Sequence, residues 1–302
     1  MDPERAPLRR AYCRGRGGRG GSILRGPDSR VPGVIGRCAR LEIEFDTRRG
    51  RTIVAHAYAE PPFRIGAFDL DDAAYVIVVC SGPGVFAGDA LRQSIRVRSG
   101  ARAVLTSQSA LQVHPGHAAP ATIRHEYRLD PDAELHCHWD PVIPFAGASV
   151  SQQFDIEADA TSRLYWSDAL MAGRLGRGEA WQFEAFAHEL RLRVAGALTY
   201  LERFRVTPRD RALTAPWMAG DAGYFATTLV KHGRVDAGAA EALHRRFENL
   251  PASRVAVDAI ESGLLVARLI AADGATFAGV RAALRRTAVE SIFGRPNLLG
   301  RK

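Results

Sequence analysis

The sequence contains few cysteines, and their spacing matches neither a disulfide framework nor a CxxC metal site. Four cysteines are scattered over 302 residues. Single thiols spread in this way are typical of a reducing compartment, so we expect a cytoplasmic protein. The four are Cys13, Cys38, Cys80 and Cys137.

Long apolar runs and several catalytic motifs are also missing. No run reaches the roughly 18 apolar residues that a membrane span needs, so we expect no membrane partner. The pair Arg9-Arg10 is followed by Ala-Tyr-Cys-Arg-Gly-Arg and not by an apolar segment, which argues against export. Gly-x-Ser-x-Gly and Gly-Lys-Ser/Thr are both absent, so the sequence has neither a hydrolase nucleophile elbow nor a P-loop.

Positive charge is concentrated at the start of the chain. The formal net charge is +8, and residues 1–40 hold ten Arg against three acidic residues, which leaves +1 for the rest. This segment has few aromatic side chains that could stack on bases, so we expect no nucleic-acid partner. Its composition predicts a disordered Arg/Gly-rich arm over residues 1–36, followed by a single β-rich domain over residues 37–302.

Beyond the arm, apolar and polar residues alternate in short runs separated by Gly, Pro or Asp. This pattern predicts a mainly β fold, an antiparallel multi-stranded β domain with one face of each sheet in solvent. Helical periodicity appears only late in the chain, and it predicts two helices near the C-terminus, over 237–247 and 276–293. The expected strands cover 41–45, 52–58, 91–97, 101–105, 121–127, 150–156, 181–186, 190–194, 198–204 and two runs within 255–271.

The stretch Ser81-Gly-Pro-Gly-Val-Phe-Ala-Gly-Asp89 satisfies the spacing of a dinucleotide fingerprint, but its context does not fit one. A dinucleotide fold needs a helix after the glycines, and here the alternating strand 91–97 follows. The acidic residue that would bind a ribose is also absent, because no Asp or Glu lies between Asp89 and Glu126. Asp89 is therefore either a turn residue that accepts backbone amides or a functional carboxylate.

Several motifs in collinear order resemble the urease accessory protein UreD family, also called UreH. The resemblance covers about residues 37–295. Its carriers are the loop Gly82–Asp89, Gly100-Ala101, Thr106-Ser-Gln108, Pro141-Val-Ile-Pro-Phe145, and Gly173-Arg174 with Gly178-Glu179. The arm has no clear counterpart in the family.

The resemblance implies a scaffold without catalytic residues of its own. Members of the family bind UreF and then the GTPase UreG, dock on apo-urease and help to deliver nickel to its active site. Nickel is then a transported ion and not a tightly bound cofactor. An internal water-filled passage is the expected route of the metal.

Four side chains are candidate transient nickel contacts. Asp89 and Glu179 end glycine-containing loops that the resemblance singles out, and we expect both to lie on water in a channel or on a docking face. His136 and His138 fall on one face of a predicted strand with Cys137 on the other, and we expect them at solvated positions. Carboxylates and imidazoles are both ligands that nickel accepts.

A second class of function remains open on the sequence. His114-Pro-Gly-His117 and His136-Cys-His138 could supply ligands to a metal-dependent hydrolase on a β-sandwich, which would need three such ligands and an acid to activate water. Purified protein assayed alone with nickel separates the two classes, because a scaffold is inert.

Overall fold

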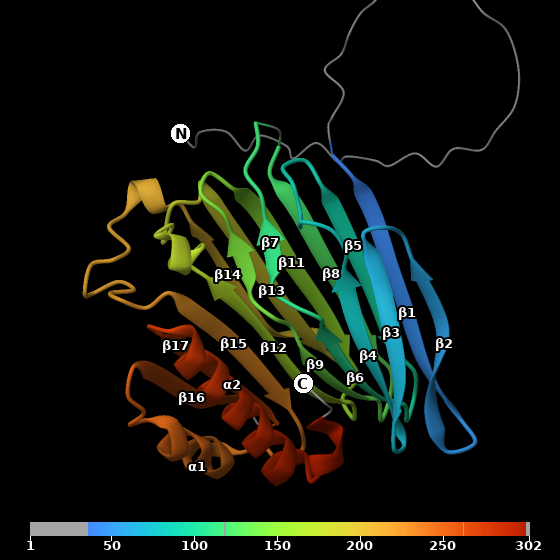
Figure 1. Cartoon of the computed structure of the whole chain (residues 1–302). Coiled ribbons are helices and arrows are strands. Elements are labelled where there is room, and N and C mark those ends of the chain that lie inside the picture. Colours follow the sequence, from blue (N-terminus) through green and yellow to red (C-terminus); the bar gives the residue numbers. More distant parts are fainter. Residues whose placement is uncertain (1–35, 118, 262, 300–302) are drawn as a thin grey trace, which may run out of the picture. The chain divides into compact units, whose positions relative to one another are not determined.

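The computed structural model of the chain describes residues 36–117, 119–261 and 263–299. Figure 1 presents the fold, which is built from two β-sheets and two α-helices. The predicted Arg/Gly-rich arm lies outside the described residues apart from Gly36. None of the described helices is long and apolar enough to cross a membrane.

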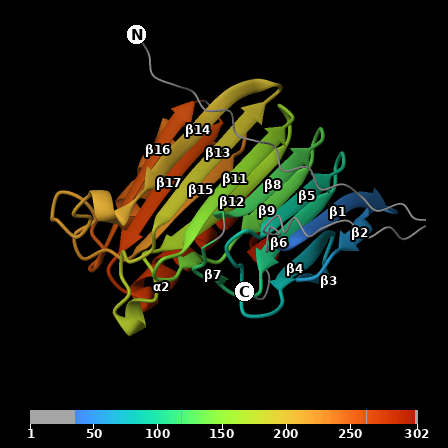
Figure 2. The same ribbon diagram turned by 90° about the horizontal axis from the view of Figure 1, so that it is seen from above.

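The two sheets lie face to face as two layers, as the view in Figure 2 makes clear. The seven-stranded sheet has the order β14-β13-β11-β8-β5-β1-β2. Its strands are β1 (Cys38–Arg48), β2 (Arg51–Ala59), β5 (Ala90–Val97), β8 (Ala121–Leu129), β11 (Ser149–Ala158), β13 (Ala185–Val194) and β14 (Ala197–Val206).

The ten-stranded sheet has the order β16-β17-β15-β12-β9-β6-β4-β3, with the short strand β10 paired to β12 and the short strand β7 paired to β10. Its strands are β3 (Phe63–Leu70), β4 (Ala73–Cys80), β6 (Arg102–Ser107), β7 (Leu111–Val113), β9 (Glu134–His138), β10 (Val142–Pro144), β12 (Arg163–Met171), β15 (Tyr224–Lys231), β16 (Ser253–Glu261) and β17 (Leu264–Ala271).

The mainly β prediction is confirmed, but the prediction of an antiparallel domain is wrong for the centre of both sheets. The chain alternates between the sheets, from β4 to β5, β6, β8, β9, β11, β12 and β13, so that it winds as a solenoid. Strands of successive turns therefore run parallel, as β5, β8, β11 and β13 do. Antiparallel pairs occur toward the ends of the sheets, such as β1 with β2 and β13 with β14.

Short connectors join the sheets at one end of the solenoid. Residues 98–101, 130–133 and 159–162 each carry the chain from the seven-stranded to the ten-stranded sheet. Backbone hydrogen bonds stack them, because Asp130 N–H donates to Val97 C=O and Asp159 N–H donates to Leu129 C=O. Each turn of the solenoid thus repeats the same strand–connector–strand unit. Long loops return the chain at the opposite end, the upper end in Figure 1.

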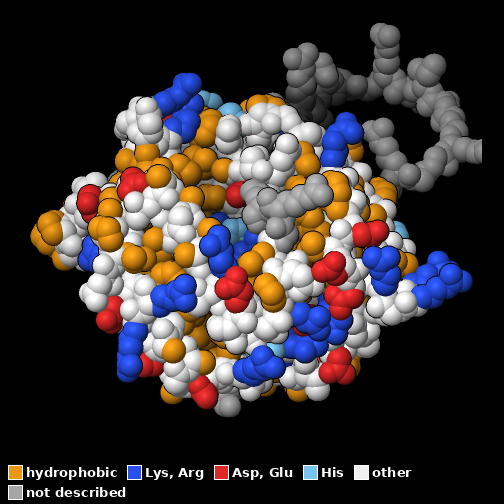
Figure 3. All heavy atoms as spheres, turned by 60° about the horizontal axis from the view of Figure 1, so that its bottom comes forward, with side chains coloured by type: hydrophobic (Ala, Val, Ile, Leu, Met, Phe, Trp, Pro, Cys, Tyr) orange, Lys and Arg blue, Asp and Glu red, His pale blue; other side chains and the backbone are white. Residues whose placement is uncertain are grey.

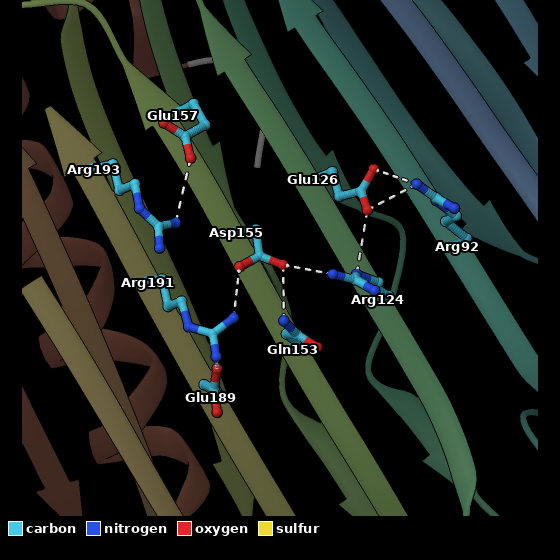
Figure 4. Close-up of polar contacts among 9 residues, drawn as sticks. All are labelled: Arg92, Arg124, Glu126, Gln153, Asp155, Glu157, Glu189, Arg191 and Arg193. Carbon is cyan, nitrogen blue, oxygen red and sulfur yellow. Dashed lines mark hydrogen bonds and ion pairs between the residues drawn. The ribbon is translucent and has the colours of Figure 1, made fainter. Parts of the chain in front are cut away.

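The main hydrophobic core fills the space between the sheets. Alternate residues of each strand point into it, and the largest fully buried side chains there include Phe45, Phe154 and Trp166. The opposite face of the seven-stranded sheet carries a network of ion pairs, which Figure 4 shows for nine residues. The predicted alternation of buried and solvated faces holds for this sheet.

The two helices cover the outer face of the ten-stranded sheet. Helix α1 (Ala237–Phe247) matches the predicted range, and Asp236 caps it by accepting from Ala239 N–H. Helix α2 (Gly274–Ala288) begins two residues earlier than predicted and continues as the π-helical turn Val289–Phe293. A second core of apolar residues from both helices and β12, β15, β16 and β17 holds them in place.

One predicted strand is absent. Residues 181–186 show alternation, yet β13 begins only at Ala185 and continues to Val194, so that it also absorbs the strand predicted over 190–194. Trp181 adopts a positive φ of 58°, which an extended strand does not allow. The tertiary structure uses Trp181 and Phe183 as apolar loop residues that pack on the core.

Candidate functional site

The long loops that carry the sequence motifs stack on one another at the upper end of the solenoid. His114 N–H donates to Val85 C=O, and Phe145 N–H donates to Val113 C=O. Gly147 N–H in turn donates to Gln182 C=O. Motifs that lie as much as ninety residues apart in sequence therefore form one continuous loop surface.

A row of stacked side chains runs across this loop surface; we call it the stacked row. The ring centroids of Phe86 and His114 are 4.6 Å apart and the rings are nearly parallel. The rings of His114 and Phe145 meet edge to face, with 4.7 Å between their centroids. The guanidinium of Arg174 then lies 4.1 Å above the Phe145 ring. Arg174 forms an ion pair with Glu179, which ends the row.

Glu179 is held by protein partners. Nε of Arg174 donates to one carboxylate oxygen at 2.7 Å, and Nη2 donates to the other. The hydrogen bonds from Arg174 lower the pKa of Glu179, so that the carboxylate stays charged. Gly173 has a φ of +128°, and a Cβ there would lie 2.2 Å from the Glu179 carbonyl oxygen, so only glycine allows this close approach.

The expectation that Asp89 lies on water is wrong. Its side chain is buried, and its two carboxylate oxygens accept the backbone N–H groups of Arg37 at 2.7 Å and Phe86 at 2.9 Å. The Arg37 guanidinium lies 3.8 Å from the same carboxylate. Asp89 thus closes its own loop and attaches the start of β1 to it, which is the turn role.

We therefore expect Asp89→Ala to destabilise the fold by about 2–3 kcal/mol, because two backbone donors lose a charged acceptor. Asp89→Asn retains one acceptor oxygen and should cost about half as much. Urea denaturation of the two variants and the wild type measures the difference. Unchanged stability in Asp89→Ala would contradict the turn role.

The interior between the sheets contains polar side chains, one on each of four neighbouring parallel strands. Each occupies a position in phase with the buried apolar residues of its strand, and all are nearly inaccessible to solvent. The pairing places Gln93 opposite His125 and Gln152 opposite His188. The members of this interior polar row are Gln93, His125, Gln152 and His188.

A cavity of about 110 Å³ lies at one end of the interior polar row. Gln93, His125 and Gln152 line it from the seven-stranded sheet, and the loop around Gly82–Gly84 lines it from the loop surface. Burial lowers the pKa of His125 to about 3, so the imidazole is neutral and one ring nitrogen keeps the lone pair that a metal ion would bind. The cavity connects the motif loops to the interior.

A second cavity, of about 220 Å³, lies at the other end of the interior polar row. His188 and Asp168 face each other there, with 3.7 Å between Nδ1 and a carboxylate oxygen. This spacing would suit an ion pair, but burial lowers the pKa of His188 to about 4 and raises that of Asp168 to about 8. Both groups are therefore neutral at pH 7.

Charged side chains at the rim of this second cavity form a closed network. Glu202 accepts hydrogen bonds from Arg268 and from the Tyr200 hydroxyl at 3.0 and 2.7 Å. Thr227 donates to the same carboxylate. The buried charge of Glu202 is therefore satisfied within the protein.

Phe154, on β11 between β8 and β13, contacts one lining residue of each cavity. Its fully buried ring stacks on His125 at 4.4 Å and lies 5.8 Å from His188 on the opposite side. Trp166 packs against it edge to face at 4.8 Å. The interior is thus polar at two places, and the Phe154 ring packs against a histidine of each.

The two candidate histidines of β9 share one face, as predicted, with Cys137 on the other. The prediction that they are solvated is wrong for His136, because α2 and the turn after it cover this face of the sheet. His136 is buried against Phe293, and its Nε2–H donates to Glu134 at 2.9 Å. Burial lowers the pKa of His136, and within the described residues its Nδ1 has no partner. His138 is half-buried at the end of the strand.

The four predicted nickel contacts do not form one centre. Asp89 and Glu179 belong to the loop surface, whereas His136 and His138 lie on the helix-covered face of the ten-stranded sheet. Across the part of the chain that the structure describes, no three His, Cys, Asp or Glu side chains gather in a way that could hold a metal ion. Any role of the four in nickel transfer stays a prediction.

The sequence offered a signal for the interior polar row. In Leu91-Arg-Gln-Ser-Ile95 and Val150-Ser-Gln-Gln-Phe154, a polar residue takes a place that the alternation reserves for an apolar one. Surface charge gives no comparable signal, because in Figure 3 basic and acidic side chains are interspersed over the face that comes forward.

Comparison with known proteins identifies the family. The sequence model of the family described as UreD urease accessory protein matches residues 37–302. The chain is 33% identical over 211 residues to urease accessory protein UreD of Sorangium cellulosum, covering 69% of this chain and 66% of that protein. It is also 33% identical over 218 residues to UreD of Pseudomonas aeruginosa, covering 72% of each.

A third relative matches over a shorter region. Urease accessory protein UreD of Trichodesmium erythraeum is 33% identical over 150 residues, which span 47% of this chain and about half, 54%, of that protein. All three relatives are named as accessory proteins and not as enzymes, in agreement with the prediction that the chain is not an enzyme. The family match includes every motif of the loop surface and all four members of the interior polar row. The chain belongs to the UreD family of urease accessory proteins.

Proposed function

We propose that this protein is a scaffold for urease maturation, which binds UreF and through it UreG, docks on apo-urease and helps nickel reach the active site. The family match over residues 37–302 is the observation that carries this proposal. The protein works in the cytoplasm, where urease is assembled. Nickel is its cargo and is not retained.

The interior polar row supports a transfer role. His125 and His188 are neutral because burial lowers the pKa of each, to about 3 and about 4. A neutral imidazole and an amide oxygen are ligands that nickel accepts without a strong charge attraction. Contacts of this kind release the ion more readily than a closed cage of carboxylates would. The Phe154 ring, which lies between His125 and His188, must move for an ion to pass from one to the other.

The alternative, a metal-dependent hydrolase on a β-sandwich, has no observation in its favour. The Nε2–H of His114 donates to the Pro83 carbonyl at 2.7 Å, and the imidazole packs between the rings of Phe86 and Phe145. His136 is committed to Glu134. The relatives carry the names of accessory proteins.

The test is urease activation in a host that expresses the urease subunits, UreF and UreG with or without this chain. We expect little active urease and little urease-bound nickel in its absence, and recovery of both in its presence. Equal activation without the chain would contradict the proposal.

The interior route has its own variant, His125→Leu/His188→Leu. We expect this protein to fold and to bind UreF as the wild type does, but to activate urease poorly. Urea denaturation and co-purification with UreF serve as the controls. Normal activation by a folded double variant would show that nickel does not depend on these imidazoles.

A further inference from the structure

The second half of β14 and the loop that follows it expose both apolar and basic side chains. Within residues 201–218, which we call the Arg/Trp segment, Trp217 is 83% exposed, Leu201 46% and Met218 40%. Arg205, Arg209 and Arg211 are exposed as well. The loop projects from the edge of the seven-stranded sheet at the left of Figure 1, and hydrophobic side chains form the left-hand tip in Figure 3.

The arginines of the Arg/Trp segment differ in their ion pairing from those of the strands β5, β8, β11 and β13. On the outer face of β5, β8, β11 and β13, each arginine drawn in Figure 4 meets a carboxylate, as Arg191 meets Asp155 and Glu189. Arg203 on β14 still pairs with Glu189. Among the described residues, no carboxylate lies within 4.0 Å of the guanidinium groups of Arg205, Arg209 or Arg211.

The Arg/Trp segment also borders the mouth of the second cavity. Phe204 and Val206, at the end of β14, line that cavity, and Phe204 is 36% exposed. Trp181 from the motif loop lines it too and packs on Phe225. The chain after the segment returns to the loop that holds Gly173 and Glu179, because Ala172 N–H donates to Gly223 C=O. A partner seated on the segment would therefore stand beside the opening to Asp168 and His188.

From these observations we infer that the Arg/Trp segment is a docking surface for a protein partner that presents acidic and apolar side chains. An exposed tryptophan on the same segment as exposed arginines is the residue composition of interface hot spots. Three exposed arginines gathered on one segment, against the single exposed carboxylate of Asp210 there, call for carboxylates on the partner, which fixes its charge. The inference rests on the proposed function for the identity of the partner: one of the proteins of urease maturation.

The test uses the full chain and purified UreF, UreG and apo-urease, each measured separately for binding. The variants are Trp217→Ala and the charge reversal Arg205→Glu/Arg209→Glu/Arg211→Glu. We expect each variant to bind one of the three proteins roughly tenfold more weakly or worse, and we expect higher salt to weaken the wild-type complex. Melting temperatures close to the wild type show that the variants fold.

A matched control reverses three other exposed arginines, Arg48→Glu/Arg64→Glu/Arg254→Glu, which lie on other strands and change the net charge by the same amount. This control should bind all three proteins normally. Wild-type affinity of both segment variants for all three proteins overturns the inference. So does loss of binding to an RNA oligonucleotide or to anionic lipid vesicles with protein binding intact. If the wild type itself binds none of the three, the proposed function fails instead.

Discussion

Phe154→Ala should lower the free energy of unfolding by about 3–5 kcal/mol, the usual cost of removing a buried phenyl ring. The ring is fully buried between the sheets and contacts His125 and Trp166 at 4.4 and 4.8 Å between ring centroids. Its removal takes away apolar burial and aromatic contacts together. Denaturation with urea, followed by the fluorescence of Trp166 and the other tryptophans, measures the loss.

Two further variants bracket this effect. Phe154→Leu keeps most of the volume, so we expect a loss of about 1 kcal/mol. Phe68→Ala removes a ring that is 52% exposed, and its cost should stay near 0.5 kcal/mol. A Phe154→Ala protein within ~1 kcal/mol of the wild type would mean that the interior collapses onto the gap or that the ring is not fixed there.

Local alternation predicted the strands well but could not predict their partners. The run over 91–97 is a strand in the sequence and in the structure, where it is β5 (Ala90–Val97). The four residues that follow it resemble a hairpin turn, yet they lead to the opposite sheet, so the parallel neighbour of β5 is β8. A period of two reports which side of a strand is buried, and it contains no information on strand direction.

The sequence predicted the residues of the candidate site better than their surroundings, because local patterns do not show which distant residues will contact them. Asp89 and Glu179 were found from motif context. Glu179 pairs with Arg174 of its own motif, whereas the structure gives Asp89 a partner that is distant in sequence. The carboxylate of Asp89 accepts from Arg37, fifty-two residues away. His136 looked solvated because the residues that bury it, Phe293 among them, belong to the C-terminal segment that folds over β9. Such cover is set by tertiary packing and leaves no trace in the alternation of one strand.

Asp168 should make the stability of this protein fall as pH rises. Burial, and after it the nearby charge of Glu202, raises the pKa of Asp168 to about 8 in the folded protein. In the unfolded chain an aspartate titrates near pH ~4. Between these values the folded state binds one more proton than the unfolded state, so each pH unit removes up to about 1.4 kcal/mol of stability. The contribution is complete below pH ~4 and is lost by pH ~8.

Asp168→Asn replaces the carboxyl group by an amide of the same shape that does not titrate. We expect the variant to gain stability relative to the wild type as pH rises from about 4 to about 8, by a few kcal/mol in total. The control is Asp155→Asn on the outer face, where the carboxylate contacts Arg124 and Arg191. That change should cost about 0.5–1 kcal/mol and show no such gain at higher pH. Urea denaturation of the three proteins at intervals of one pH unit measures both trends. A constant difference between Asp168→Asn and the wild type would mean that Asp168 is ionised in the folded protein, and the second cavity would then offer nickel a charged ligand instead of neutral ones.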